Sequence, residues 1–249
     1  MAKLKGFLKI EGTLDELTFY KTQDGHLVKT KSGVSGDRIA NDPTFQRTGE
    51  NGTEFGAAAT AGKLLRDTVR TLMLTASDNR VTARVTQLMT IIKNYDTTSV
   101  RGERTVGVGI AAPGATNELK NFDFNISAIL SSIFYKTYSI NITTGVITIS
   151  NLIPAIDIAA PSGATHVTLR GAWAKVDFAA NDSSVGYTNA TNLAIDNTST
   201  SVTLTPSPVP TGSGNDLFFL ALEFFQEVNG VQYSLKNGAY NSLAIVEVA

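Results

Sequence analysis

The stretch LFFLALEFFQEV at 217–228 is followed by Asn229-Gly230 and a second β-prone run that begins at Val231. Phe, Leu and Val in a run of this length favour a strand over a turn. An Asn-Gly pair between two such runs is the strongest short-range signal of a β-hairpin. The sequence therefore predicts that this segment forms a hairpin in an antiparallel sheet.

Further β-prone runs extend on the N-terminal side of this hairpin and up to the last residues of the chain. A second hairpin is expected where Thr143-Thr144-Gly145 separates two alternating runs. Together these runs make seven or eight short strands with turns between them, which predicts an antiparallel β-sandwich, immunoglobulin-like or jelly-roll, over 106–249. The expected strands cover 138–142, 146–149, 166–169, 172–178, 193–195, 202–204, 217–228 and 243–248.

The first part of the chain reads differently. Residues 4–31 are β-prone and contain Asp24-Gly25, which predicts another hairpin. A Gly/Ser/Asp-rich linker is expected at 32–42, and Asp42-Pro43 has the composition of a helix start. Apolar residues then recur at helical spacing in two segments separated by Ser77-Asp78-Asn79, which predicts an antiparallel helical hairpin. The first expected stripe is Phe45, Phe55, Ala58, Ala59, Gly62, Leu65, Val69, Leu72 and Met73, and the second is Val81, Val85, Leu88, Met89, Ile92 and Tyr95.

These patterns predict an α+β protein with two domains. The first, 1–105, would hold the β-hairpin and the helical hairpin, and the second, 106–249, would hold the β-sandwich. The boundary is placed at the Gly-rich segment that follows residue 105, where Val106-Gly107-Val108-Gly109 is neither clearly helical nor clearly extended. This segment lacks the GxxxxGK[ST] pattern of a phosphate-binding loop, so turns and close packing are expected there.

Composition argues against catalysis. The 249 residues are 42% hydrophobic, which suffices for a core, and 17% charged, below the typical value of about 25%. The absence of Cys excludes disulfides, thiolate nucleophiles and Cys-based metal sites. Only two His are present, His26 and His166, whereas zinc sites usually draw on several His or Cys. We therefore expect no cofactor and no metal.

Two pairs of carboxylates, Asp15 with Glu16 and Glu223 with Glu227, are candidates for acid–base catalysis. Glu223 and Glu227 are four residues apart in an expected strand, so they would share one face at a separation of about 13 Å. The paired carboxylates of glycosidases lie roughly 5–10 Å apart. The spacing therefore disfavours acid–base catalysis, and we predict that the chain is not an enzyme.

Basic residues on the two expected helices form a candidate partner-contact surface. Lys63, Arg66 and Arg70 would share one helix face, and Arg80 and Arg84 another. The alternative is an ordinary solvated face, with Asp67 close by. No aromatic residues alternate with these cations and no nucleic-acid motif is present, so nucleic acid is not expected as a partner.

Charge is divided unevenly between the two halves. Residues 1–104 hold 16 Lys and Arg against 12 Asp and Glu, whereas residues 105–249 hold 5 against 10. Opposite charges on the two halves favour head-to-tail contacts between copies, and such contacts build rings or open filaments. We therefore expect a structural protein that self-associates, as a subunit of a virion, tail-like tube, filament or surface array.

An adhesin or glycan-binding β-sandwich is the alternative function. Aromatic residues are frequent in the second half, and exposed ones could form a platform for a sugar ring. Most of them are expected in the core, and a lone Trp inside a strand, such as Trp173, is usually buried. The first residues, MAKLKGFLKIEG, alternate instead of forming an apolar core, so no classical signal peptide is expected. No stretch reaches the roughly 18 apolar residues of a membrane span. A virion or an extracellular surface assembly is the expected location.

The first 75 residues also carry a resemblance. Leu14, Phe19-Tyr20-Lys21, Val28-Lys29-Thr30-Lys31, Asp42-Pro43, Gln46-Arg47 and Phe55 follow one another in that order. This part resembles a module of uncharacterised bacterial proteins, in which a β-hairpin and a basic loop precede a helix and a β-domain. Such proteins are loosely associated with phage-like or surface assemblies. The resemblance implies a structural role and brings no catalytic residues.

Overall fold

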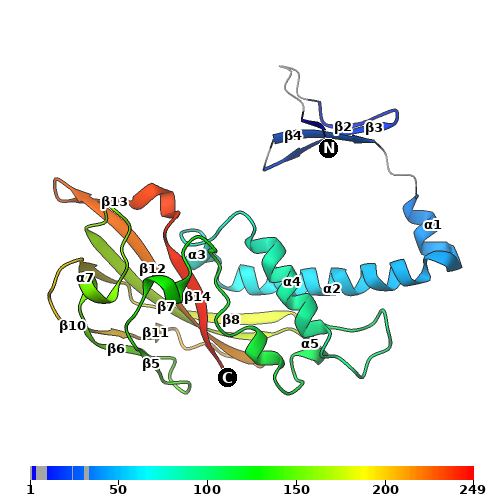
Figure 1. Ribbon diagram of the computed structural model, residues 1–249. Helices are drawn as coiled ribbons and strands as arrows, with labels where there is room; N and C mark the ends of the chain where they lie inside the picture. The colour runs from blue at the N-terminus through cyan, green and yellow to red at the C-terminus, as the bar shows by residue number, and fades with distance from the viewer. Residues whose placement is uncertain (1, 4–9, 24, 31–33) are drawn as a thin grey trace. The chain divides into compact units, whose positions relative to one another are not determined.

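The computed structural model describes residues 2–3, 10–23, 25–30 and 34–249. The chain divides into two compact units, Met1–Gly49 and Glu50–Ala249. Helices and antiparallel sheets are both present, so the predicted α+β class is confirmed (Figure 1). The predicted boundary near residue 105 lies inside the second unit.

The segment 217–228 lies at the centre of the second unit. It forms most of β12 (Asn215–Val228), which pairs antiparallel with β7 (His166–Asp177) over residues 215–225. The predicted hairpin is confirmed, because β12 turns directly into β13 (Val231–Ser234). Asn229 and Gly230 both have positive φ, 52° and 79°, as a two-residue type I′ turn requires.

The second unit contains two sheets. The large one is seven-stranded and antiparallel, with β12 paired to β7, β13 and β14, and with β8 and β9 on the far side of β7. The small one has three strands in the order β10-β6-β5. The strands not yet located are β5 (Ser139–Ile140), β6 (Ile147–Leu152), β8 (Asp182–Thr188), β9 (Thr191–Ala194), β10 (Thr200–Leu204), β11 (Pro206–Ser207) and β14 (Ser242–Val248).

The alternation of side chains along β12 places one core on each face of the large sheet. Phe218, Leu220 and Leu222 share a buried cluster with Ile147 and Val202 of the small sheet. The small sheet therefore packs against this face, as a predicted two-sheet arrangement requires; its assignment as immunoglobulin-like or jelly-roll stays a prediction. Leu217, Phe219 and Ala221 point to the opposite face and share a second cluster with the helices. The order of layers is helix, large sheet, small sheet (Figure 1).

The helical layer consists of α2 (Gln46–Thr68), α3 (Arg70–Met73) and α4 (Val81–Lys93). The Arg66 guanidinium donates to the Thr82 hydroxyl over 3.3 Å, and Lys93 pairs with Glu54, so α2 and α4 run antiparallel as predicted. A Cβ on Gly62 would lie 3.2 Å from Val85 Cγ1, so the missing side chain allows the close approach of the two helices. Most of the predicted first stripe is buried, but Phe55 is 61% exposed.

At the predicted domain boundary, after residue 105, the chain packs into the core that the helical layer shares with the large sheet. Val106 and Ile110 are buried in the same cluster as Leu65 of α2 and Phe219 of β12. Val106–Gly109 forms the short helix α5, and a Cβ on Gly109 would lie 2.2 Å from the carbonyl oxygen of Ile92. Glycine here serves close packing, as expected, and does not mark a linker. Four other short helices complete the unit: η2 (Ala115–Glu118), α6 (Leu130–Ile133), α7 (Pro154–Asp157) and η3 (Leu235–Gly238).

The first unit contains an antiparallel four-stranded sheet in the order β1-β4-β3-β2. Its strands are β1 (Ala2–Lys3), β2 (Gly12–Leu14), β3 (Leu17–Thr22) and β4 (Gly25–Thr30). The hairpin predicted around Gly25 is confirmed, whereas Asp24 and the expected strand residues Leu4 and Phe7 lie outside the described residues.

The predicted linker at 32–42 is in part a helix. Ser35 caps α1 (Gly36–Asn41) by accepting from Arg38 N over 3.2 Å, so its Gly/Ser/Asp composition is that of a helix start. The second predicted start is confirmed, because the Asp42 carboxylate accepts from Thr44 N and Pro43 opens η1 (Pro43–Phe45). None of the helices in the described ranges has the length and hydropathy needed to cross a bilayer.

Candidate functional site

Four of the five predicted basic contact residues lie on or near the surface. Lys63 pairs with Asp67 over 2.9 Å, and Arg66 donates from Nε to the Gly62 carbonyl over 3.1 Å. The helix breaks after Thr68, yet Arg66 and Arg70 still line one shallow hollow of about 180 Å³ beside α3. Arg80 is exposed at the start of α4. The structure thus brings Arg66 and Arg70 together at one hollow, whose lining does not include Arg80.

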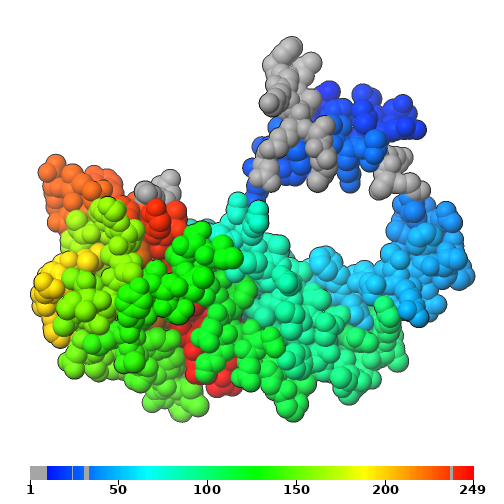
Figure 2. All heavy atoms as spheres, viewed as in Figure 1, coloured from blue at the N-terminus to red at the C-terminus, as the bar shows by residue number. Residues whose placement is uncertain are grey.

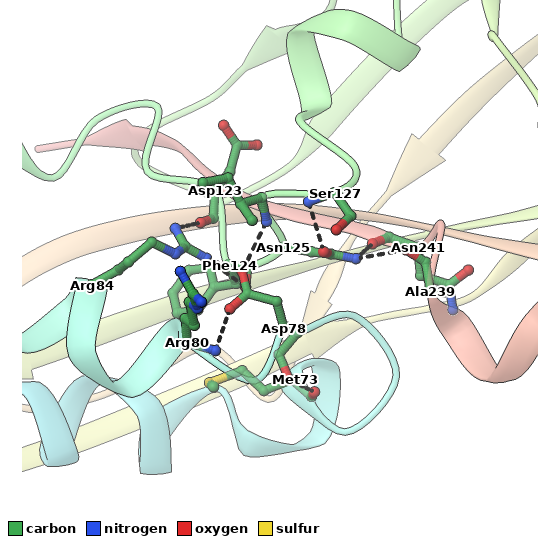
Figure 3. Close-up of polar contacts among 12 residues, drawn as sticks. Met73, Asp78, Arg80, Arg84, Asp123, Phe124, Asn125, Ser127, Ala239 and Asn241 are labelled. Atoms are coloured by element: carbon green, nitrogen blue, oxygen red, sulfur yellow. Dashed lines mark hydrogen bonds and ion pairs between the residues drawn. The ribbon is translucent and has the colours of Figure 1, made fainter. Parts of the chain in front are cut away.

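Arg84 has a different role from the predicted one. Its guanidinium donates to the carbonyl oxygens of Asp123 over 2.6 Å and Phe124 over 3.0 Å, and it pairs with Asp78 (Figure 3). Its side chain is only 22% exposed. Arg84 therefore fastens the segment after residue 122 to the helical layer, and these bonds occupy the groups that a partner would need.

Asp78, the ion-pair partner of Arg84, also holds the segment after residue 122 to the helical layer. Burial alone would raise the pKa of its carboxyl group, but hydrogen bonds from Ile126 N, Arg80 N and the Arg84 guanidinium outweigh burial and hold the pKa below its usual value. The carboxylate therefore stays charged at neutral pH. It links the turn before α4 to the segment after residue 122, which Arg84 also contacts (Figure 3).

The anchored segment runs along the outer edge of β14. Asn121 N donates to the Ile245 carbonyl over 2.8 Å, Ile245 N donates to Phe122 O over 3.0 Å, and Phe124 N donates to Leu243 O over 2.8 Å. These bonds cover the first half of an edge strand, which would otherwise expose unpaired backbone groups. The second half of β14 borders a groove.

This edge groove has a volume of about 890 Å³ and lies between β14 and the segment 130–142. Its lining includes Ile140 of β5 and Val246 of β14, so it opens where the edges of the two sheets face each other. In Figure 2 the red C-terminal strand is visible between green segments on either side. The apolar lining is Leu130, Phe134, Ile140, Ile142, Ala244 and Val246, and the polar lining includes Lys120, Asp123, Tyr135, Lys136, Tyr138 and Glu247.

Charges in the edge groove are mostly paired. Lys120 contacts Glu247 at 2.7 Å, and Lys136 contacts Asp157 at 3.4 Å. Burial raises the pKa of Asp123 against the effect of a hydrogen bond from Leu130 N, and its carboxyl group points away from Arg84 in Figure 3. Burial, and then the charge of Glu247, raises the pKa of Tyr138, so its hydroxyl keeps its proton. The edge groove thus offers hydroxyl and carboxyl groups beside apolar walls.

The carboxylates predicted as candidates for catalysis do not line the edge groove, and neither does Trp173. Glu223 is buried and accepts from the Thr75 hydroxyl over 3.0 Å, whereas Glu227 is exposed and lies 3.6 Å from His166 Nε2. Trp173 is 5% exposed and donates to Asp216 over 2.6 Å, so it is buried, as expected of a lone Trp within a strand. Within the described part of the chain, no three His, Asp or Glu residues are arranged to hold a metal ion.

The N-terminal sheet has two unlike faces. Direct pairing puts Leu14 opposite Leu17 and Phe19 opposite Val28, so these four side chains lie on one face, here called the apolar face. The other face carries Thr13 and Thr18, whose hydroxyls are 3.2 Å apart, and Lys29, which lies 5.6 Å from the Tyr20 ring centroid. No residue of this sheet whose exposure is described is fully buried, and Phe19 and Val28 are half-buried. Leu14 is 65% and Leu17 is 42% exposed.

No family model, curated protein or solved structure matches this chain. The resemblance of residues 1–75 therefore stays a prediction, and the function has to be argued from the chain's own structure. Two features of the described structure are candidates for contact with a partner: the apolar face of the N-terminal sheet and the edge groove.

Proposed function

We propose that this protein is a non-enzymatic structural subunit that self-associates into a larger assembly, such as a virion, a tail-like tube, a filament or a surface array. The observation that supports this most is the apolar face of the N-terminal sheet. Phe19 and Val28 share it with Leu14 and Leu17, and none of the four is buried.

Such a sheet needs a covering surface. A sheet gains its stability by packing one face against another layer, and burial of a Phe or Leu side chain contributes about 1.5–3 kcal/mol. Within the chain, Phe19 and Val28 are half-buried and Leu14 and Leu17 are exposed, so a further layer would increase the burial of all four side chains. In an assembly of identical subunits, each copy can supply the layer that covers the apolar face of its neighbour. Self-association is therefore the favoured function.

Charge supports a second kind of contact. Residues 1–104 hold 16 Lys and Arg against 12 Asp and Glu, and residues 105–249 hold 5 against 10, so the two halves have opposite net charges. We propose head-to-tail contacts between the basic N-terminal and acidic C-terminal halves of successive copies. The exposed cations Lys63, Arg70 and Arg80 are candidates for such contacts. Contacts of this kind extend an assembly beyond a dimer.

Phe19→Asp is expected to reduce self-association strongly. The substitution would place a carboxylate in an apolar contact, where it has no hydrogen-bond partner, and we expect a rise of a factor of about 10 or more in the dissociation constant. Sedimentation velocity of the full chain over a range of concentrations measures this. Thr18→Asp is the matched control, because it adds the same charge at the neighbouring position on the other face. If the wild-type protein remains a monomer at all concentrations and salt levels, the proposal fails.

A glycan-binding module is the second candidate, and the edge groove is the observation that favours it. Tyr135 is 61% exposed and lines the edge groove beside Tyr138 and Asp123, a combination of ring, hydroxyl and carboxyl groups that suits a sugar. Tyr135→Ala should abolish binding on a glycan array. Tyr233→Ala removes an equally exposed tyrosine, 58% accessible, from outside the edge groove and should leave binding unchanged. Absence of any glycan signal with the wild-type protein would remove this candidate.

A further inference from the structure

We propose that the N-terminal sheet docks face to face on the same sheet of a second copy, with the strands of the two sheets antiparallel. The inference rests on the proposed self-association and specifies its contact. The occupant of the apolar face is thus the apolar face of another copy, so that two four-stranded sheets enclose one shared core.

The apolar face suits such a contact because its apolar residues form adjacent pairs in register. Leu14 pairs with Leu17 across the β2–β3 ladder, and Phe19 pairs with Val28 across the β3–β4 ladder. Two sheets that pack face to face lie about 10 Å apart and interdigitate such side chains. The same residues on both sides make the surface self-complementary, as a two-fold contact requires.

The two ends of this face carry opposite charges. At one end, Asp15 and Glu16 form the two-residue turn between β2 and β3, and both are exposed. At the other end of the apolar face, Lys21 of β3 lies opposite His26 of β4. These two residues are the next pair on this face after Phe19 and Val28. Asp24, between these two strands in sequence, lies outside the described residues. The acidic turn and Lys21 are thus at opposite ends of β3.

These charges are too far apart to neutralise each other within one copy. Glu16 and Lys21 are five residues apart along β3, about 17 Å at the usual rise of a strand. The Debye length at physiological ionic strength is about 8 Å, so their attraction within one sheet is screened. A partner sheet that runs in the opposite direction would bring each of these charges next to one of opposite sign.

The charge pattern selects the antiparallel arrangement. A two-fold axis in the interface and perpendicular to the strands reverses the second copy, so Lys21 of one copy faces Glu16 of the other, and this contact occurs twice. A parallel arrangement would place Lys21 over Lys21 and the acidic turn over the acidic turn, which is repulsive. The stacked apolar pairs are compatible with either direction, so the charges decide.

A charge swap tests this arrangement on the full chain. Lys21→Glu places Glu against Glu16 twice per dimer, and Glu16→Lys places Lys against Lys21 twice. Because exposed pairs contribute roughly 0.2–1 kcal/mol each and two are lost per dimer, each single variant should raise the dissociation constant by about 2- to 30-fold at low salt. The double variant Glu16→Lys/Lys21→Glu should return it toward the wild-type value. An equimolar mixture of the two single variants should also associate, because both contacts of the mixed dimer are attractive.

Sedimentation equilibrium at low and high salt measures these constants. Rescue in the double variant and in the mixture supports the antiparallel contact, and loss of all differences at high salt supports its electrostatic origin. If the single variants associate like the wild type, or the double variant stays as weak as the singles, the arrangement is wrong. If Phe19→Asp still blocks association in that case, the self-association stands and only the antiparallel mode falls. If Phe19→Asp has no effect either, both fall.

Discussion

Lys93→Met is expected to lower the free energy of unfolding by about 3–5 kcal/mol, the usual cost of leaving one member of a buried ion pair without its partner. Lys93 of α4 pairs with Glu54 of α2, and the two side chains are only 7% and 6% exposed. Glu54 also accepts from Gly102 N over 2.8 Å and lies 3.8 Å from Arg104 Nε. This pair therefore joins both long helices to the segment that follows α4.

The double variant Glu54→Leu/Lys93→Met should recover most of the loss, because replacing both members of a buried pair by apolar residues is often neutral. Lys63→Met is the matched surface control: its pair with Asp67 is 71% and 50% exposed, and its loss should cost about 1 kcal/mol or less. Urea denaturation gives all three values. A Lys93→Met variant as stable as the Lys63→Met variant would contradict the burial of the pair.

The same pair has a pH dependence. The hydrogen bonds from Lys93 and Gly102 hold the pKa of Glu54 below its usual value, against the effect of burial. A carboxyl group with a lowered pKa in the folded state stabilises the fold above its unfolded pKa, about 4.3, and loses that contribution as the pH falls. In Lys93→Met, protonation relieves the unpaired charge of Glu54. The stability gap between the wild type and Lys93→Met should therefore narrow below about pH 4.

Phe219→Ala is expected to cost about 3–5 kcal/mol, the range for removal of a fully buried Phe. Phe219 lies on β12 opposite Ala172 and Ile245, and its ring centroid is 6.1 Å from that of Phe124. Its cluster also contains Leu65 and Val85 of the helices. We therefore expect one cooperative transition in which helices and sheet unfold together.

Far-ultraviolet and near-ultraviolet circular dichroism during denaturation check this. Phe55→Ala is the control, because Phe55 is 61% exposed and its removal should change stability by less than about 0.5 kcal/mol. Two separated transitions, with helices lost before the sheet, would contradict a shared core and would favour a domain boundary near residue 105.

The β-hairpins and the helical hairpin could be predicted because their signals are local. Asn229-Gly230 fixes a turn by its own backbone preference, and Asp42-Pro43 opens a helix by its own cap. The packing of the helices on the large sheet had no such signal. Small residues such as Ala172 and Ala221 line that face of the sheet, and nothing local distinguishes them from residues under a loop. The sequence therefore predicts a domain boundary at the Gly-rich segment after residue 105.

The candidate sites show the same division. The apolar face follows from strand alternation once the register is known, although the sequence alone did not separate Phe19 from Tyr20. The edge groove joins Tyr135 to Val246, which are far apart in the chain, so only the tertiary fold brings them together. Arg84 has the spacing of a surface cation, and its burial depends on the carbonyl oxygens of Asp123 and Phe124, which no helical pattern reveals.

Hydrogen exchange of the full chain at two protein concentrations tests the central claim most directly. Self-association through the apolar face predicts that the amides of β3 and β4 become more protected as concentration rises, while those of β7 and β12 stay unchanged. Phe19→Asp should remove that dependence. Equal protection of β3 and β4 at both concentrations, whether high or low, would contradict docking of the N-terminal sheet on a second copy.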